Sequence, residues 1–247
     1  MVTVDLVYPV RPGNVNEELR YSLRSVEANY PHGRVWIVGD QPNWLTGVEF
    51  IRGNTQPHPR ANIYHNLLAA CAHPDLADEF VIFNDDFFVT EPVEGTPMAY
   101  RSTLRQHLNL PRLRTSQSWW KDSLTTTLIC LQAVGIDEPL SYELHVPFPV
   151  NKALMAATLE QFKNVTPANP PQWRSLYGNL HASGAVMQPD SKVFRPGPLR
   201  TPYHSTTDVS WRNFRTTFRT LFPEPSPYEL DNGVIQQSRG TRVSTAV

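Results

Sequence analysis

The feature that most constrains this chain is the alternation of apolar runs with helical segments over its first ninety residues. Short runs of β-branched and apolar residues predict strands over 3–9, 34–40, 47–53 and 79–89. Apolar residues at helical spacing predict helices over 17–30 and 61–72. Strands that alternate with helices favour an α/β layered fold, with a mostly parallel central sheet flanked by helices.

The first predicted helix has clear boundaries. Asn16 is a suitable N-cap, because its side chain can accept a hydrogen bond from a free backbone N–H of the first turn. Glu17 and Glu18 place negative charge where the helix dipole favours it. The helix should end at Tyr30, because Pro31 disfavours helical geometry in the residue before it.

The second half of the chain is less regular. The segment 123–135 fits either a helix or a strand. Further predicted elements are helices over 150–162, 173–184 and 208–222, with a short strand around Val193. Asp208 is the expected N-cap of the last helix. We expect one domain over 1–230 and a flexible C-terminal tail over 231–247, where no periodic pattern occurs.

The composition indicates where the protein resides and which binding partners are disfavoured. With 22 Lys and Arg against 23 Asp and Glu, the chain has no overall basic field for nucleic acid, although a local basic groove stays open. Cys71 and Cys130 lie in apolar runs, which indicates reduced thiols and a cytoplasmic protein. No signal peptide is recognisable, and no apolar run reaches the roughly 18 residues that span a membrane.

The strongest chemical signal is the motif FVIFNDDFF. Asp85 and Asp86 follow a buried strand, and ligands of parallel sheets bind beyond the carboxyl ends of strands. Two adjacent carboxylates are costly to bury unless a cation compensates them, and Mg²⁺ commonly binds one or two carboxylates together with substrate phosphates. The alternative is a solvated turn, which the apolar residues on both sides make less favourable.

Four other residues are candidates for catalysis or binding, although each has a simpler interpretation when it is taken alone. His145 lies between prolines that fix its position, so its imidazole suits proton transfer with a hydroxyl, but taken alone a structural histidine is the better interpretation. Arg174 opens a predicted helix and suits a phosphate, although an ordinary surface arginine is the simpler interpretation. Asp208 and His204 suit metal binding, with capping or packing as the alternative.

Several segments together resemble a known family. NEELRYSLRSVEANYPHGRVWIVGDQPNWL resembles the second conserved region of the Stealth family, which includes capsular polysaccharide phosphotransferases. FVIFNDDFF matches the family's Asn-Asp-Asp motif, HVPFPVNKAL its third region, and WRSLYG the helix that follows. TDVSW and LFPEPSPYEL are similar to its fourth region, and the order is kept over about 3–230.

The resemblance implies a GT-A-like (Rossmann-like) fold and a Mg²⁺- or Mn²⁺-dependent transfer from a nucleotide sugar, with a UDP-linked donor expected. Catalytic roles would fall to His145, Asp86, Arg174 and Asp208. The metal ligands would be Asp85, Asp86, Asp208 and His204. Donor contacts would come from Arg11, Arg20, Asp40, Arg60, Asn62 and Asn84.

The chain also departs from the family pattern. The family often has a glutamate in the helix before the Asn-Asp-Asp motif, whereas Asn62, His65 or Asn66 occupies that region here. Both a sugar and a sugar-1-phosphate therefore stay open as the group moved to a hydroxyl of a glycan or protein. The alternatives are a glycosyltransferase that modifies nucleic acid, a partner we do not expect, and a non-catalytic carbohydrate-binding module.

Overall fold

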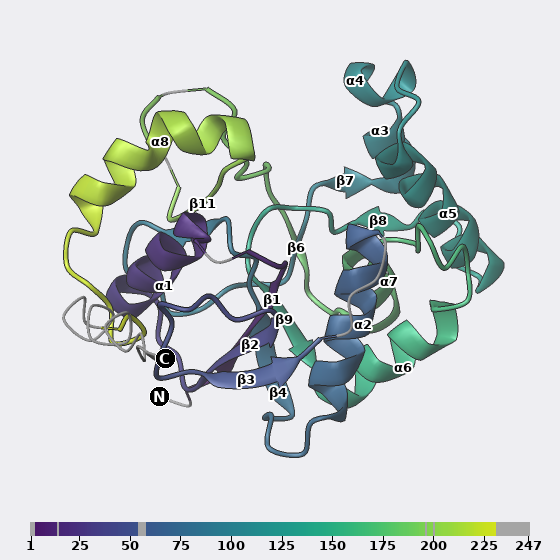
Figure 1. The fold of residues 1–247 in the computed structure, drawn as a ribbon. Helices are drawn as coiled ribbons and strands as arrows, with labels where there is room; N and C mark the ends of the chain where they lie inside the picture. The colour runs from purple at the N-terminus through teal and green to yellow at the C-terminus, as the bar shows by residue number, and fades with distance from the viewer. Residues whose placement is uncertain (1–2, 14, 54–57, 196, 200, 231–247) are drawn as a thin grey trace, which may run out of the picture.

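The computed structural model describes residues 3–13, 15–53, 58–195, 197–199 and 201–230. Its centre is a five-stranded sheet in the order β3-β2-β1-β4-β9 (Figure 1). The strands are β1 (Asp5–Val10), β2 (Val35–Gly39), β3 (Glu49–Arg52), β4 (Glu79–Ile82) and β9 (Phe148–Asn151). All neighbours pair in parallel except β9, which runs antiparallel to β4. The predicted α/β fold with a mostly parallel sheet is confirmed.

Alternation along β1 divides the core between the two faces of the sheet. Leu6 and Tyr8 face helix α1 (Glu17–Asn29) and pack with its Leu19 and Leu23. Val7 belongs to the core of the opposite face. That face is covered by α2 (Pro59–Ala72) and α6 (Lys152–Phe162), so helices flank both sides of the sheet (Figure 1).

The predicted strand 79–89 is two strands that belong to different sheets. β4 ends at Ile82, and β5 (Phe87–Val89) pairs antiparallel with β11 (Tyr203–Ser205). The chain turns at Asn84–Asp86, where the amide N–H of Phe87 donates to the carbonyl of Asn84 at 3.1 Å. The turn places the acidic pair at the carboxyl edge of the sheet instead of inside a ladder.

A largely helical part packs on the side of the sheet that α2 and α6 cover. Its helices are α3 (Leu104–Leu108), α4 (Pro111–Arg114), α5 (Trp119–Ala133) and α7 (Trp173–His181). The same part of the chain contains the short strands β6 (Ala99–Tyr100), β7 (Ser102–Thr103), β8 (Leu140–Ser141) and β10 (Val186–Met187). The segment 123–135 lies mostly within α5, so the helical one of the two interpretations is correct. Leu124 and Leu131 lie on the same buried face of this helix.

Helix α8 (Asp208–Leu221) corrects two predictions. Its N-cap is Thr207, whose side chain accepts from the amide of Ser210, so Asp208 is the first helical residue and not the cap. No strand forms around Val193 in the described chain. Only a single parallel bridge between Lys192 and Ser205 occurs there. The predicted tail over 231–247 lies outside the described residues.

None of the helices in the described part of the chain is long and apolar enough to cross a membrane.

Candidate active site

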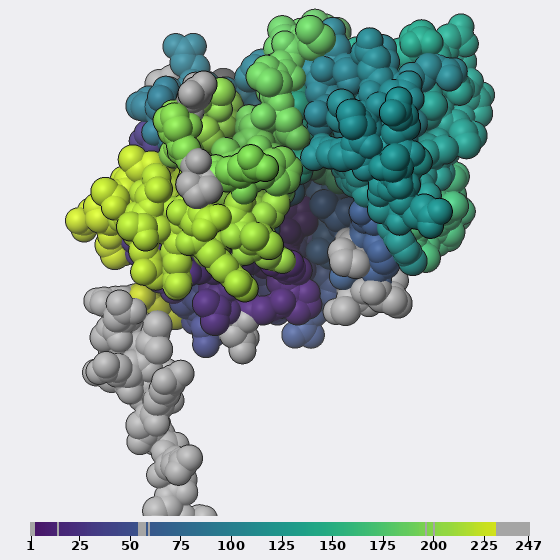
Figure 2. Space-filling view, turned by 90° about the horizontal axis from the view of Figure 1, so that it is seen from above, coloured from purple at the N-terminus to yellow at the C-terminus, as the bar shows by residue number. Residues whose placement is uncertain are grey.

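A cleft of about 920 Å³ opens at the carboxyl edge of the sheet. Residues that follow four neighbouring strands line it: Arg11 after β1, Asp40 after β2, Gly53 after β3 and Asp85 after β4. From β1 the chain runs outward to β2 and β3, and it then crosses over to β4 on the other side of β1. The strand order therefore reverses between β1 and β4, and sheets of this kind bind ligands at such a reversal. Figure 2 shows the surface hollowed between the yellow-green C-terminal part and the teal helices.

Two glycines allow close packing within one wall of the cleft. A Cβ on Gly39, whose φ is +121°, would lie 2.3 Å from the carbonyl oxygen of Val10. A Cβ on Gly53 would lie 2.3 Å from Oδ1 of Asn66. That Oδ1 atom is buried without a hydrogen-bond partner among the described residues, while the amide nitrogen of Asn66 donates to Val38. A buried acceptor at a cleft wall suits a ligand hydroxyl or N–H.

The cleft carries an excess of negative charge. Its acidic lining residues are Glu18, Asp40, Asp85, Asp86 and Asp208, against the basic residues Arg11, Arg52 and Lys192. Five carboxyl groups facing three cations would leave a net charge of −2 with every group ionised. A divalent cation supplies the opposite charge.

Asp85 is positioned by the cap of helix α1. The predicted N-cap Asn16 accepts from the amide of Leu19 through Oδ1, and its Nδ2 donates to Oδ2 of Asp85 at 2.8 Å. Burial and the neighbouring carboxylate of Asp86 raise the pKa of Asp85 above its ordinary value. Asn16 therefore caps the helix and also positions Asp85. The sequence predicted only the capping.

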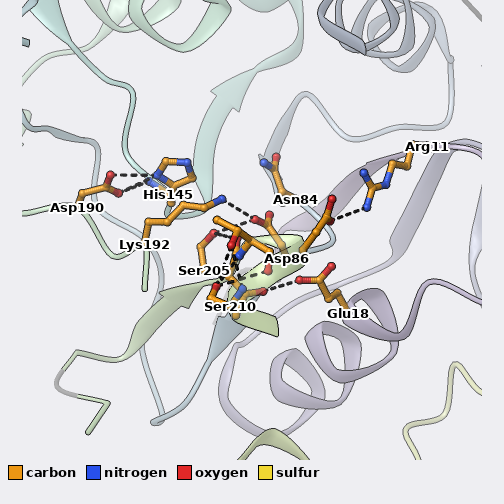
Figure 3. Close-up of polar contacts among 12 residues, drawn as sticks. Arg11, Glu18, Asn84, Asp86, His145, Asp190, Lys192, Ser205 and Ser210 are labelled. Carbon is orange, nitrogen blue, oxygen red and sulfur yellow. Dashed lines mark hydrogen bonds and ion pairs between the residues drawn. The ribbon is translucent and has the colours of Figure 1, made fainter. Parts of the chain in front are cut away.

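Asp86 is anchored from the other side of the cleft. Its Oδ2 accepts from Nζ of Lys192 at 3.0 Å and from Oγ of Ser205 at 2.9 Å (Figure 3). No hydrogen bond or ion pair from the described residues reaches its second oxygen, Oδ1. Asp208 is 77% exposed and pairs with Arg11 at 3.1 Å, so it lies at the rim of the cleft.

Glu18 was assigned only a helix-dipole role, yet it lines the cleft. Burial raises its pKa to about 7, and the charges of Asp86 and Asp85 add to the effect, although Thr206 donates a hydrogen bond to it. Because the folded protein holds this proton more tightly than the unfolded chain, stability falls as pH rises from about 4.5 to about 7.

Glu18→Gln should therefore stabilise the metal-free protein at pH 8 by roughly 2 kcal/mol and leave its stability at pH 4 unchanged. Urea unfolding at both pH values, in the presence of a chelator, measures this. Equal gains at both pH values would show that the effect is not the ionisation of Glu18. Glu49→Gln, at an exposed position of β3, is the control and should change neither value.

A smaller cavity of about 170 Å³ adjoins the cleft, and Asn84 and Ile63 line both. His145 and Arg174 line the smaller cavity. Arg174 is 8% exposed, and its Nη2 donates to Oδ1 of Asn84 at 3.3 Å. Burial lowers its pKa, which the nearby carboxylate of Glu143 partly offsets, and its Nε has no hydrogen-bond partner among the described residues. A buried guanidinium with an unused donor suits a phosphate oxygen.

The structure thus brings most of the expected site residues together. Arg11, Asp40, Asn62, Asn84, Asp85, Asp86 and Asp208 line the cleft, and Arg60, His145 and Arg174 line the cavity beside it. Arg60 lies over the ring of Trp120 and donates to Asn169. Of the residues in place of the family's glutamate, Asn62 and Asn66 line the cleft, whereas His65 is exposed and does not.

Two expected site residues lie elsewhere. Arg20 bonds to Glu229 and lies over the ring of Trp44, so it anchors the C-terminal segment and does not line the cleft. His204 is absent from the cleft because successive residues of β11 face opposite ways, and the neighbouring Ser205 is the one that contacts Asp86. The ring of His204 is buried, and burial lowers its pKa.

The residues fit a divalent cation that is shared with a ligand's phosphates, not one enclosed by protein. Within the described ranges, no three His, Cys, Asp or Glu side chains gather into a metal-binding group. Mg²⁺ commonly needs only one or two carboxylates when phosphates complete its shell. Asp85, buried with a raised pKa, and the open oxygen of Asp86 match that partial shell.

A comparison with solved structures identifies the type of fold. Superposition on the crystal structure of the galactosyltransferase LgtC, in complex with donor and acceptor sugar analogs, covers 95% of this chain and 100% of LgtC. The TM-score is 0.50 at 13% sequence identity, so the likeness concerns the fold alone. That fold is the GT-A type, as the sequence motifs led us to expect.

One curated protein adds sequence similarity. The capsular polysaccharide phosphotransferase LcbA of Aeromonas hydrophila is 39% identical over 90 residues, which are 32% of this chain. This match confirms the resemblance to the Stealth family in the part of the chain that it covers. It spans only 24% of the length of LcbA. No family model matches the chain.

Proposed function

We propose that this chain is a metal-dependent transferase that moves sugar-1-phosphate from a nucleotide sugar, UDP-linked, to a hydroxyl of a glycan or protein. The observation that carries the proposal is the meeting of Asp85 and Asp86 with Asn84, His145 and Arg174 across two adjoining cavities. The similarity to a phosphotransferase supports phosphate as part of the transferred group.

The two ends of the larger cleft set the orientation of the donor. The nucleoside would lie against the wall formed by Gly39 and Gly53, where Asn66 offers an unpaired acceptor. Arg11, Asp40 and Asn62 line the same space. The pyrophosphate would then lie towards Asn84, between the acidic pair and Arg174.

Asp85 and Asp86 would hold the cation, and Asp208 at the rim lies in the same cleft. When bound, Mg²⁺ or Mn²⁺ supplies neutralisation of the pyrophosphate charge. Arg174 adds a fixed positive charge from the other side, and its burial makes that charge more effective than a solvated one.

His145 would accept the proton of the attacking hydroxyl. The acceptor oxygen forms its new bond to the β-phosphorus, and the bond from this phosphorus to the bridging oxygen breaks. The nucleoside monophosphate leaves with the electron pair, and the hydroxyl proton passes to the ring of His145. The products are a sugar phosphodiester and a nucleoside monophosphate.

The nucleotide released distinguishes the two possible bonds. The protein would be incubated with Mn²⁺ and a panel of nucleotide sugars and acceptor glycans, and the nucleotides separated by chromatography. We expect a nucleoside monophosphate, UMP for a UDP-linked donor. Release of the diphosphate would show attack at the anomeric carbon and hence glycosyl transfer. No turnover of any donor, with glycan binding unaffected by Asp86→Ala, would indicate a non-catalytic carbohydrate-binding module.

A nucleic acid acceptor is the remaining alternative. The basic residues Arg215 and Arg219 of α8 both form ion pairs with Glu17 at 2.7 Å, which leaves that face less able to hold a phosphate backbone. Activity on DNA that falls steeply with salt, without activity on glycans or protein, would favour this alternative.

A further inference from the structure

A single segment, 188–193, connects the two halves of the proposed site. The amide of Gln188 donates to the carbonyl of Tyr100 at 2.9 Å, and that of Val193 donates to Ser205 at 2.8 Å. Between these anchors, Asp190 reaches His145 and Lys192 reaches Asp86 (Figure 3). Asp190 and Lys192 are two positions apart, so one short stretch of backbone positions a partner for His145 and a partner for Asp86.

Asp190 holds the His145 ring with both carboxylate oxygens. Nδ1 of His145 lies 2.9 Å from Oδ1 and 3.1 Å from Oδ2 of Asp190. Oδ1 also accepts from the backbone amide of His145 at 3.0 Å, and Arg101 lies 3.4 Å from Oδ2. Three donors from two residues thus converge on one carboxylate whose side chain is 14% exposed.

The ionisation of the Asp190 carboxylate determines which ring nitrogen of His145 carries the hydrogen. Burial alone would raise the pKa of Asp190, but the hydrogen bonds from His145 lower it to about 2. A carboxylate is only an acceptor, so Nδ1 must carry the hydrogen, and in the neutral ring Nε2 then has the free lone pair. Nε2 is on the side of the ring opposite Nδ1 and faces away from Asp190 (Figure 3).

We propose that Asp190 is a positioning residue, which fixes the tautomer and orientation of His145 so that Nε2 can accept the proton of the attacking hydroxyl. This inference rests on the proposed function. A carboxylate that served only to tie the segment to the protein would need the backbone amide and Arg101 alone. The additional contact with Nδ1 of His145 is the one that bears on proton transfer.

Asp190→Asn is the informative change. An asparagine has one acceptor oxygen in place of two, so it cannot serve the backbone amide, the ring Nδ1–H and Arg101 together. Where its amide nitrogen faces the ring, Nδ1 becomes an acceptor and the hydrogen moves to Nε2. We expect kcat to fall by about 10²-fold or more, with the donor KM within about twofold of the original value.

The tautomer is measured without any substrate. Histidine ¹⁵N spectra of the full chain, which has eight histidines, are assigned for His145 by comparison with His145→Gln. We expect the neutral ring to carry hydrogen at Nδ1 in the original protein and to shift towards Nε2–H in Asp190→Asn. Asp137→Asn, at an exposed position, is the matched control and should change neither the spectrum nor kcat.

The outcomes separate this inference from the proposed function. An Nε2–H tautomer in the unsubstituted protein overturns the inference, whether or not the variant folds. An unchanged tautomer or unchanged kcat in folded Asp190→Asn overturns it as well. A shifted tautomer in a protein that turns over no donor supports the positioning of His145 and refutes the transferase assignment.

Discussion

Replacing Asp86 with asparagine is expected to lower kcat/KM for the nucleotide-sugar donor by about 10²- to 10³-fold. The carboxylate accepts from Lys192 and Ser205 through Oδ2 alone, so Oδ1 is the atom available to a cation. Asparagine keeps an acceptor for the two existing contacts but removes the negative charge. The substitution should therefore weaken the binding of the cation and the pyrophosphate more than it destabilises the fold.

Two measurements separate these causes. Binding of Mn²⁺ in the absence of donor, followed by electron paramagnetic resonance, should weaken at least tenfold in Asp86→Asn. Thermal unfolding without metal should change little. The control Asp137→Asn replaces an exposed aspartate and should match the unsubstituted protein in both assays. Full activity in Asp86→Asn would remove the acidic pair from the mechanism.

Replacing Glu229 with alanine should destabilise the protein by about 3–5 kcal/mol, which is the usual cost of breaking a buried ion pair. The Glu229 side chain is 3% exposed. It bonds to Arg20, to Nε of Arg24 at 2.6 Å and to the amide of Ser226 at 3.0 Å. Without it, Arg24, whose side chain is 11% exposed, would lack its carboxylate partner.

The effect of Glu229 should depend on pH. Burial would raise the pKa of Glu229, but the hydrogen bonds from Arg24 and Ser226 lower it below its ordinary value. Its stabilisation is therefore complete above the unfolded pKa and is lost as pH falls through the folded one. Urea unfolding of Glu229→Ala between pH 7 and pH 3 measures this. Glu224→Gln, exposed in the same segment, should behave as the unsubstituted protein, and an unfolding midpoint unchanged by Glu229→Ala would contradict the prediction.

Local signals predicted the parts of the fold that depend on neighbouring residues. The apolar run with Leu6, Val7 and Tyr8 corresponds to a buried strand, and the spacing of Leu19 and Leu23 corresponds to one face of a helix. Asn16 caps α1 because its side chain meets the next turn of the same helix. The capping of α8 was assigned one residue too late, since Thr207 and Asp208 are adjacent candidates and only the backbone geometry selects Thr207.

The site was predicted where residue type and strand end coincide. Asp85 and Asp86 lie in the turn that follows β4, so their place at the sheet edge follows from the parallel topology. Side-chain direction was not predictable in the same way. His204 and Ser205 are adjacent, yet only Ser205 meets Asp86, because pairing with β5 sets the register of β11.

The sequence by itself determined the strand–helix alternation, the mostly parallel sheet and the acidic pair at the end of a buried strand, because these depend on periodicity and on residues close together along the chain. Only the tertiary structure decided the partners of the charged groups. Arg20 and Glu229 are 209 positions apart, and His145 and Asp190 are 45 apart. Local patterns carry no information about such pairs, since packing of distant segments brings them together.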